Sequence, residues 1–384
     1  MPSDNLPLRS ILFDRIRRDG PLTVAAFMEL ALYHPEHGYY ARSVRRSGRA
    51  GDYYTSVDVG PLYGELLAVF VERLFGRLRP EAPVSTRLGL VEAGAGSGRL
   101  MRDVLDALLR RAPHCYASVE VALVECSRAA REVQLDVLGP HATKLSWSAA
   151  ELPDRVVGLI FANELLDAMP VHRVRMTPDG LREIRVGADA GELVLCEGPP
   201  STRELEAYFA GVGVRLAAGA VADVSLAAPA WVRAACRSLE RGCLLLVDYG
   251  HEAAELFSPL HAEGTLRAYR AHLVDAAPRG AATPAWLTDP GERDLTAHVD
   301  FTAVRQAGLA EGVDQLAFAD QTRFLLALGL AERLGGWIGR SIQDVRGRLA
   351  AMTLVAPGGL GSTHHALLLG RGVHDAGSLL RSPA

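Results

Sequence analysis

The chain has 384 residues, of which 49% are hydrophobic and 22% charged, and its formal net charge is −4 at pH 7. This balance is typical of a soluble globular enzyme and excludes an extensively disordered chain, and no basic excess suggests nucleic-acid binding. The five cysteines include no C-x-x-C pair, which argues against a disulfide framework or a structural zinc site. We therefore expect no bound metal.

Targeting signals and membrane segments are not evident in the sequence. Residues 1–10 lack the features of a secretory signal or a transit peptide, and no apolar run is long enough to span a bilayer. We therefore expect a cytoplasmic protein. Lys144 is the only lysine among 41 basic residues, which is typical of a GC-rich bacterial genome.

The N-terminal part is predicted to be helical. Two helices are expected over residues 6–20 and 22–34, the second with Thr23 as its N-cap, and a third begins near Pro61. Between them lies an irregular stretch rich in Gly and Tyr, and a long irregular stretch in a compact protein is usually functional or disordered. We assign residues 1–80 to a helical extension that forms a lid over cofactor and substrate.

The central part alternates between short apolar runs and helical patterns. The apolar runs at 87–94, 119–126, 156–164 and 243–250 predict βαβ units and a parallel sheet buried on both faces. We expect this core over residues 81–250, with an antiparallel hairpin insertion near 171–200. A helical insertion on the substrate side is expected over 251–345, and residues 346–384 should supply strands that complete the core sheet. Within that last segment, 350–357 and 363–370 are predicted to form a terminal hairpin.

A glycine-rich turn follows the first apolar run. Arg99 stands where a dinucleotide fingerprint needs its third glycine. The pattern acidic-x-Gly-x-Gly-x-Gly is instead the first motif of class I S-adenosyl-L-methionine-dependent methyltransferases. The residues that we predict to contact the cofactor here are Glu92, Gly94, Gly96 and Gly98. The alternative is a tight strand-to-helix connection without a ligand.

Further polar residues follow the second and fourth apolar runs. Glu125 is placed to bind the ribose hydroxyls with both carboxylate oxygens. Asn163, Glu164 and Asp167 lie at the predicted carboxyl edge of the sheet, where open α/β proteins bind ligands. We expect Asn163 to contact the cofactor. In the alternative interpretation Asn163 caps a helix and the two acids favour its first turn.

These motifs together resemble the MidA-like methyltransferases, the family that includes an arginine-methylating assembly factor of mitochondrial respiratory complex I. The resemblance rests on G-D-x-x-T-S at 51–56 with N-E-x-x-D-A-x-P at 163–170, and it continues in order from Gly38 to Val304. It implies a Rossmann-like α/β core with a mostly parallel seven-stranded sheet, and S-adenosyl-L-methionine as the cofactor. Departures from the family pattern include Val57, Asp58 and Tyr63.

The G-D-x-x-T-S block at 51–56 is also expected to reach the cofactor, since it lies between two predicted helices with clear apolar faces. We predict that Asp52, Thr55 and Ser56 lie near the amino acid end of S-adenosyl-L-methionine.

An arginine acceptor requires carboxylates, because the guanidinium group is planar and always protonated. Glu164 and Asp167, at i and i+3 on an expected helix, are the first candidates, and Glu65 and Asp248 are the next. The leading hypothesis is therefore an arginine N-methyltransferase acting on a protein partner such as a respiratory-complex subunit. Two alternatives stay open: N- or O-methylation of a small compound, for instance one with a guanidino or amino group, and a cofactor-binding assembly chaperone without turnover.

Histidines and the oligomeric state are less informative. His172 and His298 are either bases or polar core residues, and His364 with His365 has no further metal ligand nearby in the sequence. The oligomeric state is open, a homodimer included.

Overall fold

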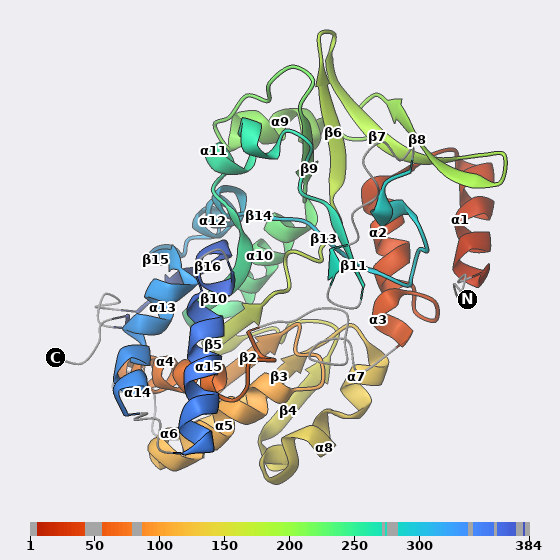
Figure 1. Cartoon of the computed structure of the whole chain (residues 1–384). Coiled ribbons are helices and arrows are strands. Elements are labelled where there is room, and N and C mark those ends of the chain that lie inside the picture. Colours follow the sequence, from red (N-terminus) through yellow and green to blue (C-terminus); the bar gives the residue numbers. More distant parts are fainter. Residues whose placement is uncertain are drawn as a thin grey trace. The chain divides into compact units, whose positions relative to one another are not determined.

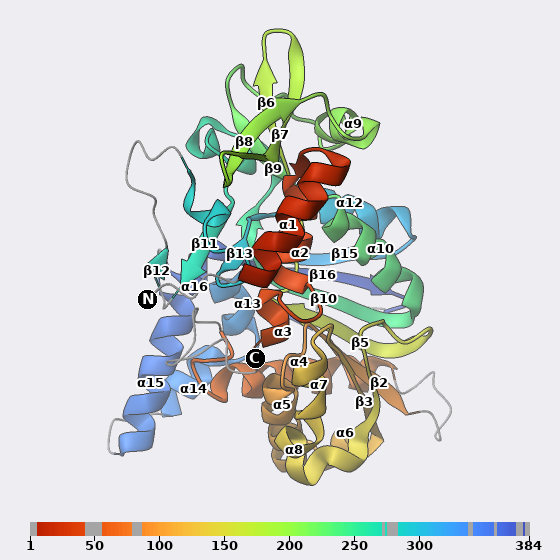
Figure 2. The ribbon, with the colours of Figure 1, turned by 90° about the vertical axis from the view of Figure 1, so that its right-hand side faces the viewer.

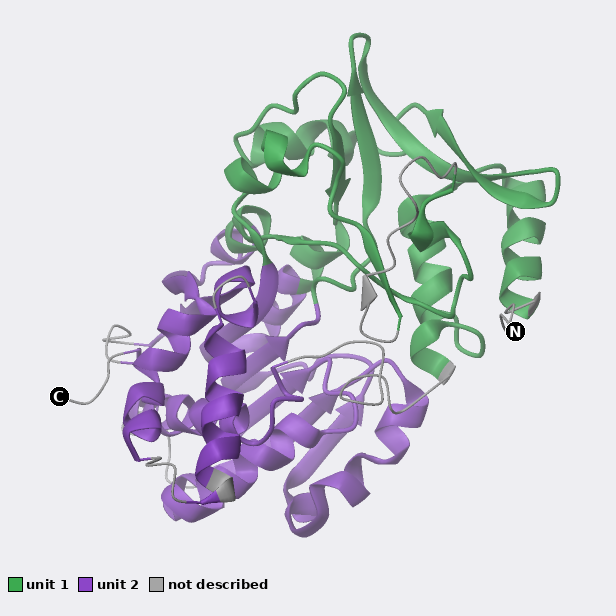
Figure 3. Ribbon diagram, in the orientation of Figure 1, with its two compact units in different colours: residues 1–53, 166–231, 250–306 green, residues 54–165, 232–249, 307–384 purple. Residues whose placement is uncertain are grey.

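A computed structural model of the chain divides it into two compact units (Figures 1 and 3). Unit 1 comprises residues 1–53, 166–231 and 250–306, and unit 2 comprises residues 54–165, 232–249 and 307–384. The structure describes residues 6–42, 56–78, 87–270, 273–274, 283–336, 341–356, 359–373 and 379–380. Three elements begin in one unit and end in the other: α10 (Ala227–Ser238), β10 (Leu239–His251) and α12 (Phe301–Ala310).

Unit 2 is built on a seven-stranded path in the order β15-β16-β10-β5-β2-β3-β4, which can be followed from β15 to β3 in Figure 2. Besides β10, its strands are β2 (Leu88–Ala93), β3 (Val119–Val124), β4 (Leu145–Ala149), β5 (Val156–Asn163), β15 (Asp314–Asp320) and β16 (His364–Arg371). Neighbours from β4 to β10 pair in parallel, whereas β16 runs antiparallel to both β10 and β15. The predicted mostly parallel α/β sheet is therefore confirmed.

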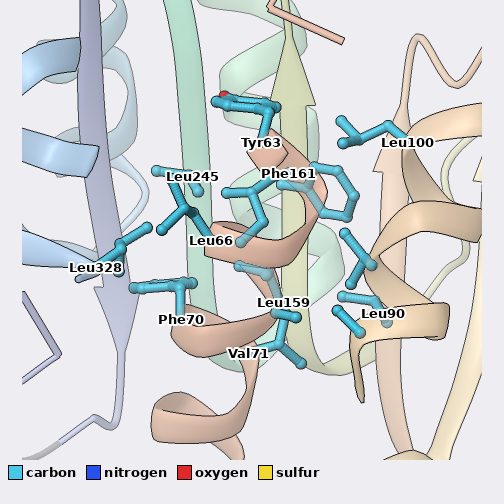
Figure 4. Packing of buried hydrophobic residues seen from close by; sticks show 14 of the residues in the cluster. Tyr63, Leu66, Phe70, Val71, Leu90, Leu100, Leu159, Phe161, Leu245 and Leu328 are labelled. Carbon is cyan, nitrogen blue, oxygen red and sulfur yellow. The ribbon is translucent and has the colours of Figure 1, made fainter. Parts of the chain in front are cut away.

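The helices of unit 2 flank this sheet, whose central strands are largely buried on both faces. They are α4 (Leu62–Leu78), α5 (Arg99–Arg111), α6 (Pro113–Ser118), α7 (Arg128–Glu132), α8 (Gln134–Leu138), η2 (Gly139–Lys144), α13 (Gln321–Ala327), α14 (Leu330–Gly336), α15 (Ile342–Val355) and α16 (Leu360–Thr363). Figure 4 shows side chains of α4, from Tyr63 to Val71, packed with Leu90, Leu159 and Phe161 of the strands. Burying each of these leucines contributes about 1.5–3 kcal/mol, so α4 is fixed against the strands that carry the site.

Unit 1 contains two smaller sheets. Its elements are α1 (Leu6–Asp19), β1 (Leu22–Thr23), α2 (Val24–Tyr33), α3 (Tyr39–Arg42), β6 (His172–Thr177), β7 (Gly180–Asp189), β8 (Glu192–Gly198), α9 (Arg203–Gly211), β9 (Val221–Val224), α11 (Ala253–Leu256), η3 (Pro259–His261), β11 (Arg267–Arg270), β12 (Leu273–Val274), η4 (Ala285–Leu287), β13 (Asp294–Thr296) and β14 (Val299–Asp300). One sheet has the path β1-β7-β6-β9 with β8 beside β7, and the other is β12-β11-β13. β14 pairs in parallel with the last two residues of β10.

Several local predictions are confirmed in unit 1. The helices α1 and α2 lie where the periodicity placed them, and the Thr23 hydroxyl accepts a hydrogen bond from the backbone N–H of Ala26 at 3.0 Å. The antiparallel insertion is formed by β6, β7 and β8. The sequence did not reveal that β1 and β9 join this sheet.

The predicted terminal hairpin is wrong. Residues 350–355 belong to helix α15, and β16 pairs with β15 and β10 instead. The helix begins at Ser341, whose hydroxyl accepts a hydrogen bond from the backbone N–H of Asp344 at 3.0 Å. This cap lies nine residues before Ala350, so the helix is already formed when the chain reaches the apolar run. The run therefore extends the helix and does not begin a strand.

The helical region that follows β15 is interrupted. Gly329 adopts a φ of +96° between α13 and α14, a left-handed conformation that commonly ends a helix. Among the described residues, no helix is both long and apolar enough to cross a membrane.

Candidate functional site

The glycine loop turns from β2 into α5 through three left-handed residues. Gly94, Gly96 and Gly98 have φ values of +71°, +51° and +82°, which favour glycine over residues with a Cβ. A Cβ at Gly94 or Gly98 would lie 3.1 Å from a leucine side chain, whereas a Cβ at Gly96 would meet no atom within 4 Å. Among the described residues, the space beside Gly96 is therefore open enough for a ligand to approach the backbone.

Glu125 is brought directly onto this loop. Its carboxylate accepts hydrogen bonds from the backbone N–H groups of Gly96 at 2.8 Å and Ser127 at 2.7 Å. Gln134 donates to the carbonyl oxygen of Gly96 at 2.9 Å and accepts from Ser148 at 2.7 Å. These bonds fix the loop and place a carboxylate beside the open position.

Glu92 is a buried carboxyl at the end of β2. Burial raises the pKa of Glu92 well above its usual value, and the backbone N–H of Met101 acts in the opposite direction. Within the described part of the chain, its Oε2 atom has no hydrogen-bond partner. A buried acid that lacks one partner is costly, and a cation or donor from a ligand would satisfy it.

Glu164 occupies a strained position after β5. Its φ is +52°, in the left-handed region that a non-glycine residue seldom adopts. The conformation is held because the Glu164 N–H donates to Val247 O at 2.8 Å and the Leu165 N–H donates to Asp248 Oδ2 at 3.1 Å. Such strain costs about 1–3 kcal/mol and tends to occur at functional sites.

The Glu164 carboxylate is fixed by donors from two segments. Its Oε1 atom accepts hydrogen bonds from the Ser56 backbone N–H and from Asn163 Nδ2, both at 3.1 Å. The side chain is 13% exposed. Ser56, Asn163 and Glu164 are therefore brought together, as their sequence blocks suggested.

Two further groups near Glu164 were not identified from the sequence as site residues. Tyr63 is fully buried on α4, and burial together with the carboxylates of Glu164 and Asp248 raises the pKa of its phenol well above the usual value. His364 Nε2 lies 3.8 Å from Glu164 Oε1, and burial lowers the pKa of His364 to about 4. At neutral pH the imidazole is uncharged, so this contact is not an ion pair.

The position of His364 follows from strand direction. Because β16 is antiparallel to β10, its first residue lies opposite Tyr249 at the carboxyl end of β10. The apolar run after His364 was recognised as a strand, and assigning it to the core beside β10 would have placed His364 at the site.

The segment 56–58 packs on the glycine-loop helix. Arg99 forms an ion pair with Asp58 at 3.0 Å and also donates to the carbonyl oxygen of Val57. The Ser56 hydroxyl donates to Gln321 Oε1 at 3.1 Å. Asp52 and Thr55, which were predicted to approach the cofactor, lie outside the described residues.

Glu65 and Asp248, two of the remaining carboxylate candidates, belong to unit 2. Glu65 forms ion pairs with Arg110 at 3.4 Å and Arg333 at 3.2 Å. Asp248 accepts backbone N–H bonds from Leu165 at 3.1 Å and Tyr249 at 2.9 Å, which gives it a positioning role for the turn at Glu164.

Asp167 belongs to unit 1, where its carbonyl oxygen accepts from Ala297 N–H at 2.9 Å. The expectation that Glu164 and Asp167 share a helix face is wrong. Residues 164–170 form bends and turns, and Glu164, with its left-handed backbone, cannot lie within a right-handed α-helix.

His172 has a structural environment in unit 1. Its Nδ1 atom lies 2.7 Å from Glu183 Oε1, and Glu183 also accepts bonds from Ser201. The pKa of Glu183 is below its usual value, because the bonds from His172 and Ser201 outweigh the opposing effect of burial. His172 and Glu183 therefore form a largely buried polar pair within unit 1.

The chain is similar to several known proteins. Residues 66–319 match a family model described as "Putative S-adenosyl-L-methionine-dependent methyltransferase". The protein arginine methyltransferase NDUFAF7, mitochondrial, of Homo sapiens is 29% identical over 365 residues, covering 87% of this chain and 76% of the relative. The Rattus norvegicus protein of the same name is 28% identical over 368 residues, covering 85% and 75%.

A solved structure resembles the whole chain. A protein from Burkholderia thailandensis, crystallised with S-adenosyl-homocysteine, is 30% identical, with a TM-score of 0.83 and coverage of 97% of this chain and 93% of that one. The resemblance inferred from the sequence motifs is confirmed by these matches. The predicted cytoplasmic location is wrong on the same comparison, since the curated relatives are named as mitochondrial proteins.

Proposed function

The chain belongs to the S-adenosyl-L-methionine-dependent methyltransferase family matched by residues 66–319, and from this premise we propose that it methylates an arginine side chain of a partner protein. The relatives named protein arginine methyltransferases support this acceptor. The fixed carboxylate of Glu164 at the edge of the sheet is the structural observation on which the proposal depends.

The residues of unit 2 fit the cofactor of this family. Glu125 would bind the ribose hydroxyls beside the open space at Gly96, and Glu92 offers an unpartnered buried oxygen. Asn163 Oδ1 is also buried without a hydrogen-bond partner among the described residues. When bound, S-adenosyl-L-methionine supplies a methyl group activated by a sulfonium. Ser56 is proposed to lie towards the amino acid end of the cofactor. The same proposal covers Asp52 and Thr55, which lie outside the described residues.

Glu164 is proposed to hold the guanidinium of the acceptor. Charge-assisted bonds from a carboxylate orient this planar cation and so present one nitrogen to the methyl group. The neighbouring imidazole of His364 is neutral at pH 7, so it does not compete as a cation for Glu164. Asp248 supports the turn, and Asp167 stays a second candidate for the acceptor.

Glu65 provides a matched comparison. It is a partly buried carboxylate of the same unit that is already paired with two arginines. We therefore propose an ion-pairing role for Glu65, outside direct contact with the acceptor.

The test is methyl transfer from labelled cofactor to an arginine-containing partner protein, with the product identified by mass spectrometry. Glu164→Gln should lower kcat/KM by about 10- to 100-fold or more, since a charge-assisted bond contributes about 1.5–3 kcal/mol, while cofactor affinity and melting temperature stay unchanged. Glu65→Gln should turn over near the wild-type rate.

Other outcomes would contradict the arginine assignment. Label in a small compound only would identify a small-molecule methyltransferase, and label in protein residues other than arginine would identify another acceptor. An intact, cofactor-bound protein that transfers no methyl group to any component of a lysate would instead support an assembly chaperone.

A further inference from the structure

Three histidines of unit 1 converge from separate segments. His251 is the last residue of β10, His261 ends η3, and His298 lies between β13 and β14. Each offers one ring nitrogen, and these nitrogens all lie within 4.8 Å of one another. All three side chains are half-buried. We propose that they bind one divalent transition metal ion of the zinc class, with water completing the coordination.

The ring separations fit a common metal centre. The centroids lie 5.0 Å apart for His251 and His261, 5.3 Å for His251 and His298, and 5.5 Å for His261 and His298. With Zn–N distances of about 2.0–2.1 Å, three imidazoles on a tetrahedral ion have centroids about 5.2 Å apart. The interplanar angles of 35°, 41° and 70° also show that these rings are not a parallel stack.

A carboxylate is placed as a supporting partner. Glu255 Oε1 lies 3.2 Å from Nδ1 of His251, which leaves Nε2 of that ring as the nitrogen available to a metal ion. Metal-binding histidines commonly donate their second ring nitrogen to a carboxylate, which fixes the tautomer and raises ligand basicity. Glu255 belongs to α11, so it is a positioning residue here and not a ligand.

The backbone fixes the other two histidines. His261 N–H donates to Ser258 O at 3.0 Å, and its carbonyl oxygen accepts from Gly264 N–H at 2.8 Å. His298 N–H donates to Thr265 Oγ1 at 3.1 Å. Preformed ligand positions reduce the ordering cost of binding, and the ion would cross-link three stretches of unit 1.

Three neutral imidazoles favour zinc, copper, nickel or iron over magnesium or calcium, which prefer oxygen ligands. Three protein ligands also leave a coordination position for water, unlike the closed four-ligand structural sites. The spacing of the cysteines, on which no bound metal was expected, gives no information about these three histidines, which lie 10 and 37 residues apart in the sequence.

The experiment is zinc titration of the untagged full chain after chelation, by calorimetry and with Co²⁺ absorption as a second probe. We expect one ion per chain. His261→Ala should weaken binding at least about 100-fold and abolish the visible Co²⁺ band, whereas Glu255→Gln should weaken it about 10- to 100-fold. His114→Ala, at an exposed histidine of α6, is the matched control and should bind as the wild type does.

Thermal melts in the presence of chelator must first show that His261→Ala has the melting temperature of the metal-free wild type. If it does not fold, Glu255→Gln serves as the test. Added zinc should then raise the melting temperature of the wild type and of His114→Ala only. Equal zinc binding by His261→Ala and wild type, or no binding by the wild type at micromolar zinc, would overturn the proposal.

Discussion

Gly96→Ala separates the conformational role of the glycine loop from its role in cofactor binding. The residue has a φ of +51°, and an added Cβ would meet no atom of the described residues within 4 Å. The substitution therefore lowers the free energy of unfolding only by the strain of a left-handed alanine, about 1–2 kcal/mol. Part of this loss is offset because alanine reduces the conformational entropy of the unfolded chain. We expect the melting temperature to fall by no more than about 2–4 °C.

Cofactor affinity should change more than stability does. If the open space beside Gly96 holds S-adenosyl-L-methionine, the new methyl group overpacks that interface. Overpacking costs about 1–3 kcal/mol, which corresponds to a rise in Kd of about 5- to 150-fold. Calorimetric titration with the cofactor and with S-adenosyl-homocysteine measures this directly.

Gly312→Ala is the matched control in the same unit. Gly312 follows α12 with a φ of +76°, and within the part of the chain that the structure describes an added Cβ would also meet no atom within 4 Å. The control should lose similar stability and keep its cofactor affinity. If Gly96→Ala binds cofactor as tightly as Gly312→Ala, the space beside Gly96 is not the cofactor site, and the reasoning from the open position fails.

Two further predictions concern single side chains of unit 2. Glu125→Ala should weaken cofactor binding by about 10- to 100-fold in the same titration, and unchanged affinity would show that the ribose is held elsewhere. His364 has a folded pKa of about 4 against an ordinary 6.5, so the unfolded chain binds more protons between these values. Wild-type stability should therefore fall by about 3 kcal/mol as pH drops from 6.5 to 4, and denaturant melts of His364→Gln should show a flatter pH dependence; identical slopes would contradict the burial of a neutral imidazole.

The core of unit 2 was predictable because its central strands are largely buried on both faces. The apolar runs that end near Glu92, Glu125 and Asn163 predict both the strands of the sheet and the edge at which ligands bind, since a parallel sheet brings these strand ends together. The hydrogen bond from the Gly96 N–H to the Glu125 carboxylate follows from the closeness of two such strand ends. Periodicity and strand direction are local properties, so one sequence is enough to infer them.

The turn at Glu164 was not predictable in the same way. The sequence after β5 has helix-compatible residues, and Asn163 is a favourable cap. The left-handed conformation of Glu164 is imposed by bonds to Val247 and Asp248, which lie more than 80 residues further along the chain. Tertiary contacts of this kind override local preference, so the helix that was expected to present two acids together does not form.

The carboxylates around Tyr63 give a physical reason why this edge of the sheet suits cationic ligands. Glu92, Glu164 and Asp248 all act to raise the pKa of its phenol, so these three acids lie within electrostatic range of one buried hydroxyl. Taking a carboxylate out of water costs free energy unless a partner compensates for it, and burial raises the pKa of Glu92 well above its usual value. A sulfonium and a guanidinium are both cations, and each would offset part of this cost on binding. Glu92 can in this way favour the cofactor and Glu164 an arginine acceptor, so that each ligand is expected to stabilise the folded chain on binding.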